Sequence, residues 1–259
     1  MPFVPTAPDP VVVVSPHLDD AVFSCGALLA SRPGSYVITV FAGGPSSITP
    51  LTGWDRECGF RDGQDIIAAR RREDVAALAL LSASPIFLNL WDLQYRDSKY
   101  GYSGEPKHQL VNRGSEELRE ALLSLPASTW VVPVGIHHPD HKLCRRMALR
   151  LFTKQAHATW LMYEELAYYH LSRTRRWSAR IAVSSALATT GSFATRHVLS
   201  HTELATETKI SAMQCYTSQM RRFSSDFVRI ASNGPESYLR ISTPWAGTAG
   251  APHTRHRSV

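Results

Sequence analysis

Short apolar runs rich in β-branched residues recur along the chain, and stretches with apolar residues at helical spacing lie between them. Five runs predict β-strands: Val11–Ser15, Tyr36–Phe41, Pro85–Leu90, Trp130–Val134 and Trp160–Tyr163. Three of the intervening stretches predict helices: Asp20–Ser31, Gly63–Leu81 and Ser115–Leu123. Strands that alternate with helices of this length predict βαβ units and a parallel sheet.

The first strand and the end of the chain set the expected domain organisation. The run at 11–14 is solidly apolar, which is typical of a strand in a sheet covered on both faces. After Ser172 the alternation weakens, and we interpret the remainder as an extension of the same domain. We therefore expect one α/β domain over residues 1–243, with a mostly parallel sheet and helices on both faces. A flexible tail is expected over 244–259.

One long segment, residues 42–63, interrupts the alternation and is rich in glycine, proline and serine. It follows the carboxyl end of a predicted strand, where open α/β sheets bind their ligands. We expect a functional loop there, since unstructured connections of this length are uncommon otherwise.

The composition describes an ordinary globular protein with an excess of basic residues. Of the 259 residues, 44% are hydrophobic and 19% are charged, and the formal net charge is +6. A chain of this length can bury a core that needs neither a disulfide nor a metal for stability, so a bound metal would serve chemistry. The four cysteines are widely spaced, without a Cys-x-x-Cys pair, which argues against a disulfide framework and a thiolate zinc site.

The sequence also indicates where the protein acts and which partners it binds. No basic and then apolar leader opens the sequence, and no run reaches the roughly 18 apolar residues of a membrane span, so we expect a cytoplasmic protein with no membrane partner. The basic residues cluster late in the chain, interleaved with apolar positions and without a recognised nucleic-acid motif. We interpret them as solvated helix faces, with an anionic substrate rim and nucleic-acid binding as the weaker alternatives. A homo-oligomer is compatible with the sequence.

The first cluster of candidate functional residues lies between the first predicted strand and the first predicted helix. In the segment SPHLDD, His17 and Asp20 are three residues apart, so they share a face of the first helical turn and can converge on one cation. Asp19 lies beside them. An aspartate at this place is also a common helix N-cap, but a cap requires one aspartate and neither the second one nor the histidine.

The second candidate cluster, GIHHPDH, follows the predicted strand Trp130–Val134 and again enters a helix. His138 and His141 repeat the three-residue spacing. Because loops that leave the same edge of a parallel sheet can meet, the two clusters together predict a metal site.

The chemistry of the two clusters suggests roles for their residues. Two histidines and a carboxylate (His17, Asp20 and His141) leave coordination positions open, as catalytic zinc requires. Non-haem Fe²⁺ oxygenases use the same ligand types, but the spacing and the α/β pattern favour hydrolysis. Asp19 is the candidate general base and His138 the candidate for oxyanion contact and protonation of a leaving amine. Asp140 is expected to orient His138, and His137 is expected to be a surface or packing residue.

These motifs resemble those of the PIG-L/LmbE-like de-N-acetylases. SPHLDD is similar to the first signature of that family and HHPDH to the second. Weaker similarity continues through AARRRED, WDLQYRD, YEELAYY, KISAMQCYTSQ and PESYLR.

The resemblance implies a Rossmann-like sheet, Zn²⁺ held by His17, Asp20 and His141, an Asp19 base and a His138 electrophile. It implies removal of acetyl from an N-acetylglucosamine unit of a small molecule, with Arg70 and Asp92 contacting the sugar. The metal can also be Fe²⁺.

Three departures from the family pattern and two alternatives bear on the substrate. The acid that often ends the first motif is Ala21 here. A tyrosine found in some members is replaced by Ile136, and a proline that is usual in the family is replaced by Ala167. None of them removes a ligand or the base, so we expect activity with an altered substrate range. The alternatives are an amidase on a non-sugar or thiol-conjugate amide, and a non-catalytic basic binding module.

Overall fold

The structure is a computed structural model that describes residues 9–45, 50–96, 105–152, 158–168 and 173–242. Its strands are β1 (Val11–Ser15), β2 (Tyr36–Thr39), β3 (Ser84–Phe87), β4 (Thr129–Pro133), β5 (Thr159–Tyr163), β6 (Phe193–Val198) and β7 (Ser237–Ser242). Its α-helices are α1 (Asp20–Ala30), α2 (Gly53–Glu57), α3 (Ile66–Leu80), α4 (Lys107–Leu123), α5 (Pro139–Phe152), α6 (Arg173–Ala188), α7 (Glu203–Met213), α8 (Thr217–Met220) and α9 (Ser225–Asn233). Two short 3₁₀ helices are η1 (Leu93–Tyr95) and η3 (Leu166–Tyr168).

The strands form one seven-stranded sheet in the order β3-β2-β1-β4-β5-β7-β6. The first five strands in this order pair in parallel, and β7 and β6 continue the sheet antiparallel. The predicted α/β class and mostly parallel sheet are confirmed. The chain order reverses at β1, whose neighbours are β2 and β4, and a reversal of this kind leaves a ligand-binding crevice at the carboxyl ends of the strands.

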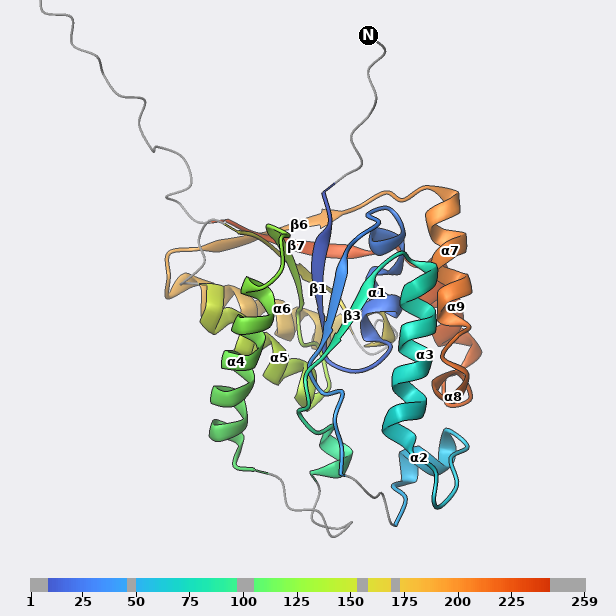
Figure 1. Ribbon diagram of the computed structural model, residues 1–259. Coiled ribbons are helices and arrows are strands. Elements are labelled where there is room, and N and C mark those ends of the chain that lie inside the picture. Colours follow the sequence, from blue (N-terminus) through green and yellow to red (C-terminus); the bar gives the residue numbers. More distant parts are fainter. Residues whose placement is uncertain (1–8, 46–49, 97–104, 153–157, 169–172, 243–259) are drawn as a thin grey trace, which may run out of the picture.

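Helices cover both faces of the sheet, as Figure 1 shows. Residues of α4, α5 and α6 pack into one hydrophobic core, and residues of α1, α3, α7 and α9 pack into the other. The side chains of Val12 and Val14 enter the first core, and those of Val11 and Val13 enter the second. This alternation explains why residues 11–14 of the first strand are all apolar: both faces of the strand are buried.

Three segments differ from the sequence expectations. The long loop at 42–63 contains helix α2, whose N-cap Thr52 forms a capping box with Asp55. Helix α4 begins at Lys107 rather than at Ser115. Gly114, a residue type that disfavours helices, lies inside α4 where this helix meets α5. A Cβ atom at Gly114 would lie 2.6 Å from Cε of Met147. The predicted C-terminal extension is structured to Ser242. The tail predicted at 244–259 lies outside the described residues.

Candidate metal and active site

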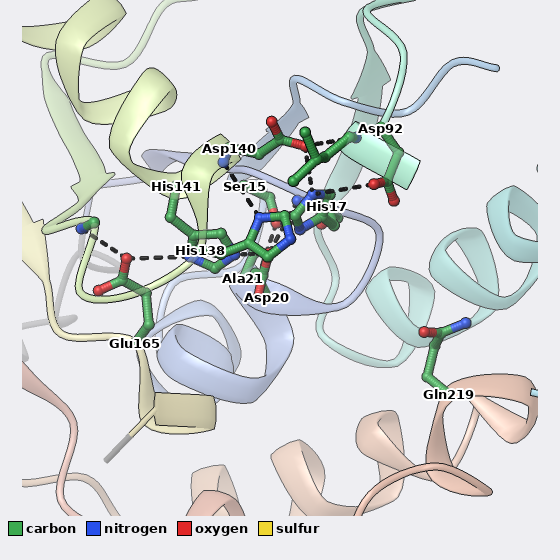
Figure 2. Close-up of polar contacts among 12 residues, drawn as sticks. Ser15, His17, Asp20, Ala21, Asp92, His138, Asp140, His141, Glu165 and Gln219 are labelled. Carbon is green, nitrogen blue, oxygen red and sulfur yellow. Dashed lines mark hydrogen bonds and ion pairs between the residues drawn. The ribbon is translucent and has the colours of Figure 1, made fainter. Parts of the chain in front are cut away.

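The site is built at the carboxyl ends of β1 and β4, on either side of the reversal in strand order. The chain leaves β1 through a turn shaped by Ser15, whose hydroxyl donates to the carbonyl of His17 at 2.6 Å and accepts from the backbone N–H of Ala21 at 3.0 Å. This turn presents His17, Asp19 and Asp20 at the start of α1. The loop after β4 presents His138, Asp140 and His141 at the start of α5. The structure therefore brings the two predicted clusters together (Figure 2).

Asp20 joins the two clusters through a single carboxylate oxygen. Its Oδ2 atom lies 3.2 Å from Nδ1 of His17 and 3.1 Å from Nε2 of His141. It also accepts a hydrogen bond from the backbone N–H of His17 at 3.0 Å. Burial opposes ionisation of Asp20, but the neighbouring His141 outweighs this effect and holds the pKa of Asp20 well below its ordinary range. Asp20, which is anionic, thus contacts both of the other predicted ligands.

His141 is oriented by Glu165, a residue that was not among the predicted site residues. The carboxylate of Glu165 lies 3.1 Å from Nδ1 of His141 and accepts the backbone N–H groups of Gly135 and Ile136 at 2.7 and 3.2 Å. A carboxylate on Nδ1 selects the tautomer that leaves the Nε2 lone pair available. That Nε2 atom is buried and faces Oδ2 of Asp20 at 3.1 Å. A buried imidazole nitrogen in this state fits a metal ligand.

The donor groups can hold a divalent metal ion in two overlapping sets. Ligand atoms of His17, His138 and His141 lie within 4.8 Å of one another, and so do those of His17, Asp92 and Asp140. His138 therefore lies close enough to act either as a ligand or, as predicted, as a group that faces the substrate. Its ring is edge-on to His17, with centroids 4.9 Å apart. Burial, together with His17 and His141, lowers the pKa of His138 to about 4.

Asp19 occupies the N-cap position of α1 but makes no capping hydrogen bond with its side chain. Its backbone has a φ of 144°, a conformation that is costly for a residue with a side chain and that is found where surrounding structure enforces it, often at functional sites. The side chain lines the cleft beside Asp20. Burial and then the adjacent Asp20 carboxylate raise the pKa of Asp19 well above its ordinary value. The capping alternative thus lacks the bond that would define it.

Asp140 orients His17 rather than His138. Its Oδ2 atom lies 3.2 Å from Nε2 of His17 and accepts the backbone N–H of Leu93 at 2.9 Å, while its other oxygen pairs with Arg96. Asp140 contacts His138 through its backbone and not through its carboxylate: the backbone N–H of Asp140 donates to Nδ1 of His138 at 3.2 Å. The orienting contact expected from the sequence therefore falls on a different histidine.

Arg70 and Asp92 face each other across the cleft floor, with Nη1 of Arg70 3.5 Å from Oδ2 of Asp92. Both are buried, so they are not the surface charges that composition alone would suggest. Asp92 also accepts the backbone N–H of Gln94 at 3.2 Å. His137, expected at the surface, is exposed; it contacts Arg175 and lines the rim.

The cleft above these residues has a volume of about 820 Å³, which is in the range of small-molecule sites. One wall is aromatic and is formed by Trp54 of α2, Phe223 between α8 and α9, and Phe227 of α9. Phe223 and Phe227 have ring centroids 4.1 Å apart. Gln219 lies on this side as well, apart from the metal-ligand cluster (Figure 2). The C-terminal segment, to which the sequence motifs assign no role, therefore forms part of the site.

The fold and the cluster define a Rossmann-like α/β protein with a buried His/Asp site at the ligand-binding edge of its sheet. The sequence profile of the PIG-L family, described as GlcNAc-PI de-N-acetylases, matches residues 12–152, and the chain belongs to this family. The resemblance stated from the motifs is confirmed. None of the curated proteins matches the chain significantly.

Solved structures with the same fold include three structures of deacetylases. A deacetylase of teicoplanin biosynthesis is 23% identical with a TM-score of 0.72, and the zinc-inhibited form of teicoplanin deacetylase Orf2 is 23% identical with a TM-score of 0.71. The A40926 pseudoaglycone deacetylase Dbv21 is 24% identical with a TM-score of 0.67. Each alignment covers 90% of this chain and 97% of the other. Among the described residues, no helix is long and apolar enough to cross a membrane.

Proposed function

We propose that this chain is a metal-dependent hydrolase that removes the acetyl group from an N-acetylglucosamine-containing small molecule. The observation that carries the proposal is that His17 and His141 both contact one oxygen of Asp20, with Nε2 of His141 buried and 3.1 Å from that oxygen. The family to which the chain belongs and the deacetylases that share its fold support the same reaction class.

We propose His17, Asp20 and His141 as the metal ligands. A divalent cation there would supply Lewis acidity toward the amide carbonyl and make a water molecule a usable nucleophile near neutral pH. Asp19 lies beside the ligands without a capping duty, so it can take the proton of the attacking water. The water oxygen bonds to the acetyl carbon, the C–N bond breaks, and the amine leaves with the proton that Asp19 took from the water, while the neutral His138 ring is placed to donate a hydrogen bond to the carbonyl oxygen. The products are acetate and the free aminosugar.

The remaining cleft residues suit a sugar. Arg70, Asp92 and Gln94 present donors and acceptors for hydroxyl groups on the cleft floor. The aromatic wall of Trp54 and Phe223 offers an apolar surface for the C–H face of a sugar ring. Asp140 binds no substrate in this scheme; it fixes the ring of His17.

The test combines metal analysis with acetate release. The purified chain is stripped of metal and titrated with Zn²⁺ or Fe²⁺ from below one equivalent to excess, since one similar deacetylase is described as zinc-inhibited. Acetate is measured with N-acetylglucosaminides and with plain N-acyl amines. We expect metal-dependent turnover of the sugars, with Zn²⁺ as the working ion. Turnover of only the plain amides would make the chain a non-sugar amidase, and no turnover with any metal would refute the proposal.

A further inference from the structure

A second basic hollow lies outside the catalytic cleft, on α6 and β6. We call it the arginine pocket; it has a volume of about 570 Å³, and its lining residues are Arg173, Thr174, Arg176, Trp177, Arg180 and Arg196. Four of these six residues are arginines and none is acidic. Trp177, which is 65% exposed, provides the apolar surface of the pocket.

The first turn of α6 is strongly basic. Arg173, Arg175 and Arg176 stand in the first turn of the helix, which contains no acidic residue. The N-terminal end of a helix carries partial positive charge, so cations there reduce its stability. A bound oxyanion would relieve this repulsion.

Two of the pocket arginines are held in place by neighbours. Arg180 pairs with the buried carboxylate of Glu164, and Nη2 of Arg196 donates to the hydroxyl of Ser237 at 3.0 Å. Side chains fixed in this way lose little conformational freedom when they bind a phosphate or carboxylate. The pocket is therefore partly organised for an anion.

A second hollow of about 430 Å³ shares one lining residue with the arginine pocket and another with the catalytic cleft; we call it the connecting hollow. It shares Thr174 with the arginine pocket and His137 with the cleft. Its lining adds the cations Lys142, Arg145 and Arg175, again without a carboxylate. The basic linings of these adjacent hollows extend from His137 at the cleft to Trp177 on α6, and we call them the basic track.

We infer that this track binds the nucleoside diphosphate part of an anionic substrate, an N-acetyl sugar joined through a diphosphate to a planar ring, as in a nucleotide sugar. This inference rests on the proposed function, which places the sugar in the cleft. The diphosphate then lies against the cations of the connecting hollow and the arginine pocket, where guanidinium groups bind phosphate oxygens in pairs. The planar base stacks on the indole of Trp177, since exposed aromatic rings bind nucleobases in this way.

The first test is binding without turnover, measured by titration calorimetry on the full chain with UDP, inorganic pyrophosphate and a short single-stranded RNA as probes. We expect UDP to bind, and to bind more weakly as salt is raised. Arg196→Gln should weaken UDP and pyrophosphate binding about tenfold or more. Trp177→Leu should weaken UDP binding but leave pyrophosphate binding unchanged. The matched control is Arg119→Gln, an exposed arginine on α4 that pairs with Glu116; it should change neither.

The outcomes separate this inference from the proposed function. Undetectable UDP binding, or binding that Arg196→Gln leaves intact, would overturn the track even if neutral N-acetylglucosaminides are deacetylated. RNA binding that exceeds UDP binding and is lost in the same variants would also overturn it, in favour of a nucleic-acid site. UDP binding that follows the expected pattern in a chain that releases no acetate would support the track and refute only the deacetylase. Finally, Arg196→Gln should raise KM for UDP-linked N-acetylglucosamine while kcat and the KM of a neutral glycoside stay unchanged.

Discussion

The buried carboxylate of Glu236 ties helix α1, which begins with Asp20, to the C-terminal part of the fold. Its Oε1 accepts the backbone N–H of Ala27 and Nζ of Lys209, both at 2.9 Å. Its Oε2 accepts the backbone N–H of Leu28 at 3.0 Å and the hydroxyl of Tyr238 at 2.8 Å. The Glu236→Gln substitution keeps the shape of this group but removes its charge, and so leaves a buried lysine without its anion.

The expected cost follows from these contacts. Loss of one partner of a buried ion pair typically destabilises a protein by about 3–5 kcal/mol. For a chain of this size, each kcal/mol lowers Tm by roughly 2–4 °C, so the melting temperature should fall by about 6–20 °C. Chemical and thermal unfolding at pH 7 measure the change. The matched control is Glu207→Gln, an exposed position on α7, which should stay within about 0.5 kcal/mol of the parent.

The pH dependence gives a second readout of the same substitution. Burial opposes ionisation of Glu236, but Lys209 and His201 outweigh it and lower the pKa of Glu236 from 4.5 to about 2. A carboxyl whose pKa is lowered on folding stabilises the protein above its unfolded pKa, and this stabilisation is lost as pH falls through the folded pKa. The stability difference between parent and variant should therefore be full above pH 4.5 and should shrink between pH 4.5 and 2. A difference below 1 kcal/mol at pH 7, or one independent of pH, would refute the reasoning.

Three further substitutions test the supports of the site. Glu165→Ala should weaken metal binding about 10- to 100-fold, because His141 loses the partner that orients it; competition with a chelator measures this, and unchanged affinity would remove Glu165 from the site. Gly135→Ala should cost about 1–2 kcal/mol in urea unfolding, because Gly135 has a φ of +74° and a Cβ there would lie 3.0 Å from the carbonyl oxygen of His141. Arg70→Ala should lower kcat/KM on the best N-acetylglucosaminide while metal content stays full, and unchanged kinetics would return Arg70 to a structural role.

The core of the fold could be predicted because its signals are local. Each parallel strand is a short apolar run, and the first helix begins and ends where its sequence predicts. The edge of the sheet carries a weaker signal: β6 is largely exposed, and its residues Phe193–Val198 show no apolar alternation. The start of α4 was missed because Gly114 serves helix packing, which depends on Met147 in a different helix.

In the candidate site, too, local patterns could be predicted and contacts between distant segments could not. His17 with Asp20, and His138 with His141, are recognisable because residues at helical spacing share a face. Contacts between distant segments leave no such pattern. Glu165 reaches His141 from the end of β5, and Phe223 enters the cleft from the C-terminal segment. The YEELAYY segment around Glu165 was the available signal, although it could not indicate which of its two glutamates turns inward toward the histidine.

The central claim divides two neighbouring aspartates between metal binding and proton transfer. The most direct test is to measure metal content and kcat together for Asp19→Asn and Asp20→Ala. We expect Asp20→Ala to lose metal and activity together. Asp19→Asn should keep its metal while kcat falls by about 10² to 10⁴, the usual contribution of a positioned general base. Asp19→Asn with full metal and full activity would contradict the account.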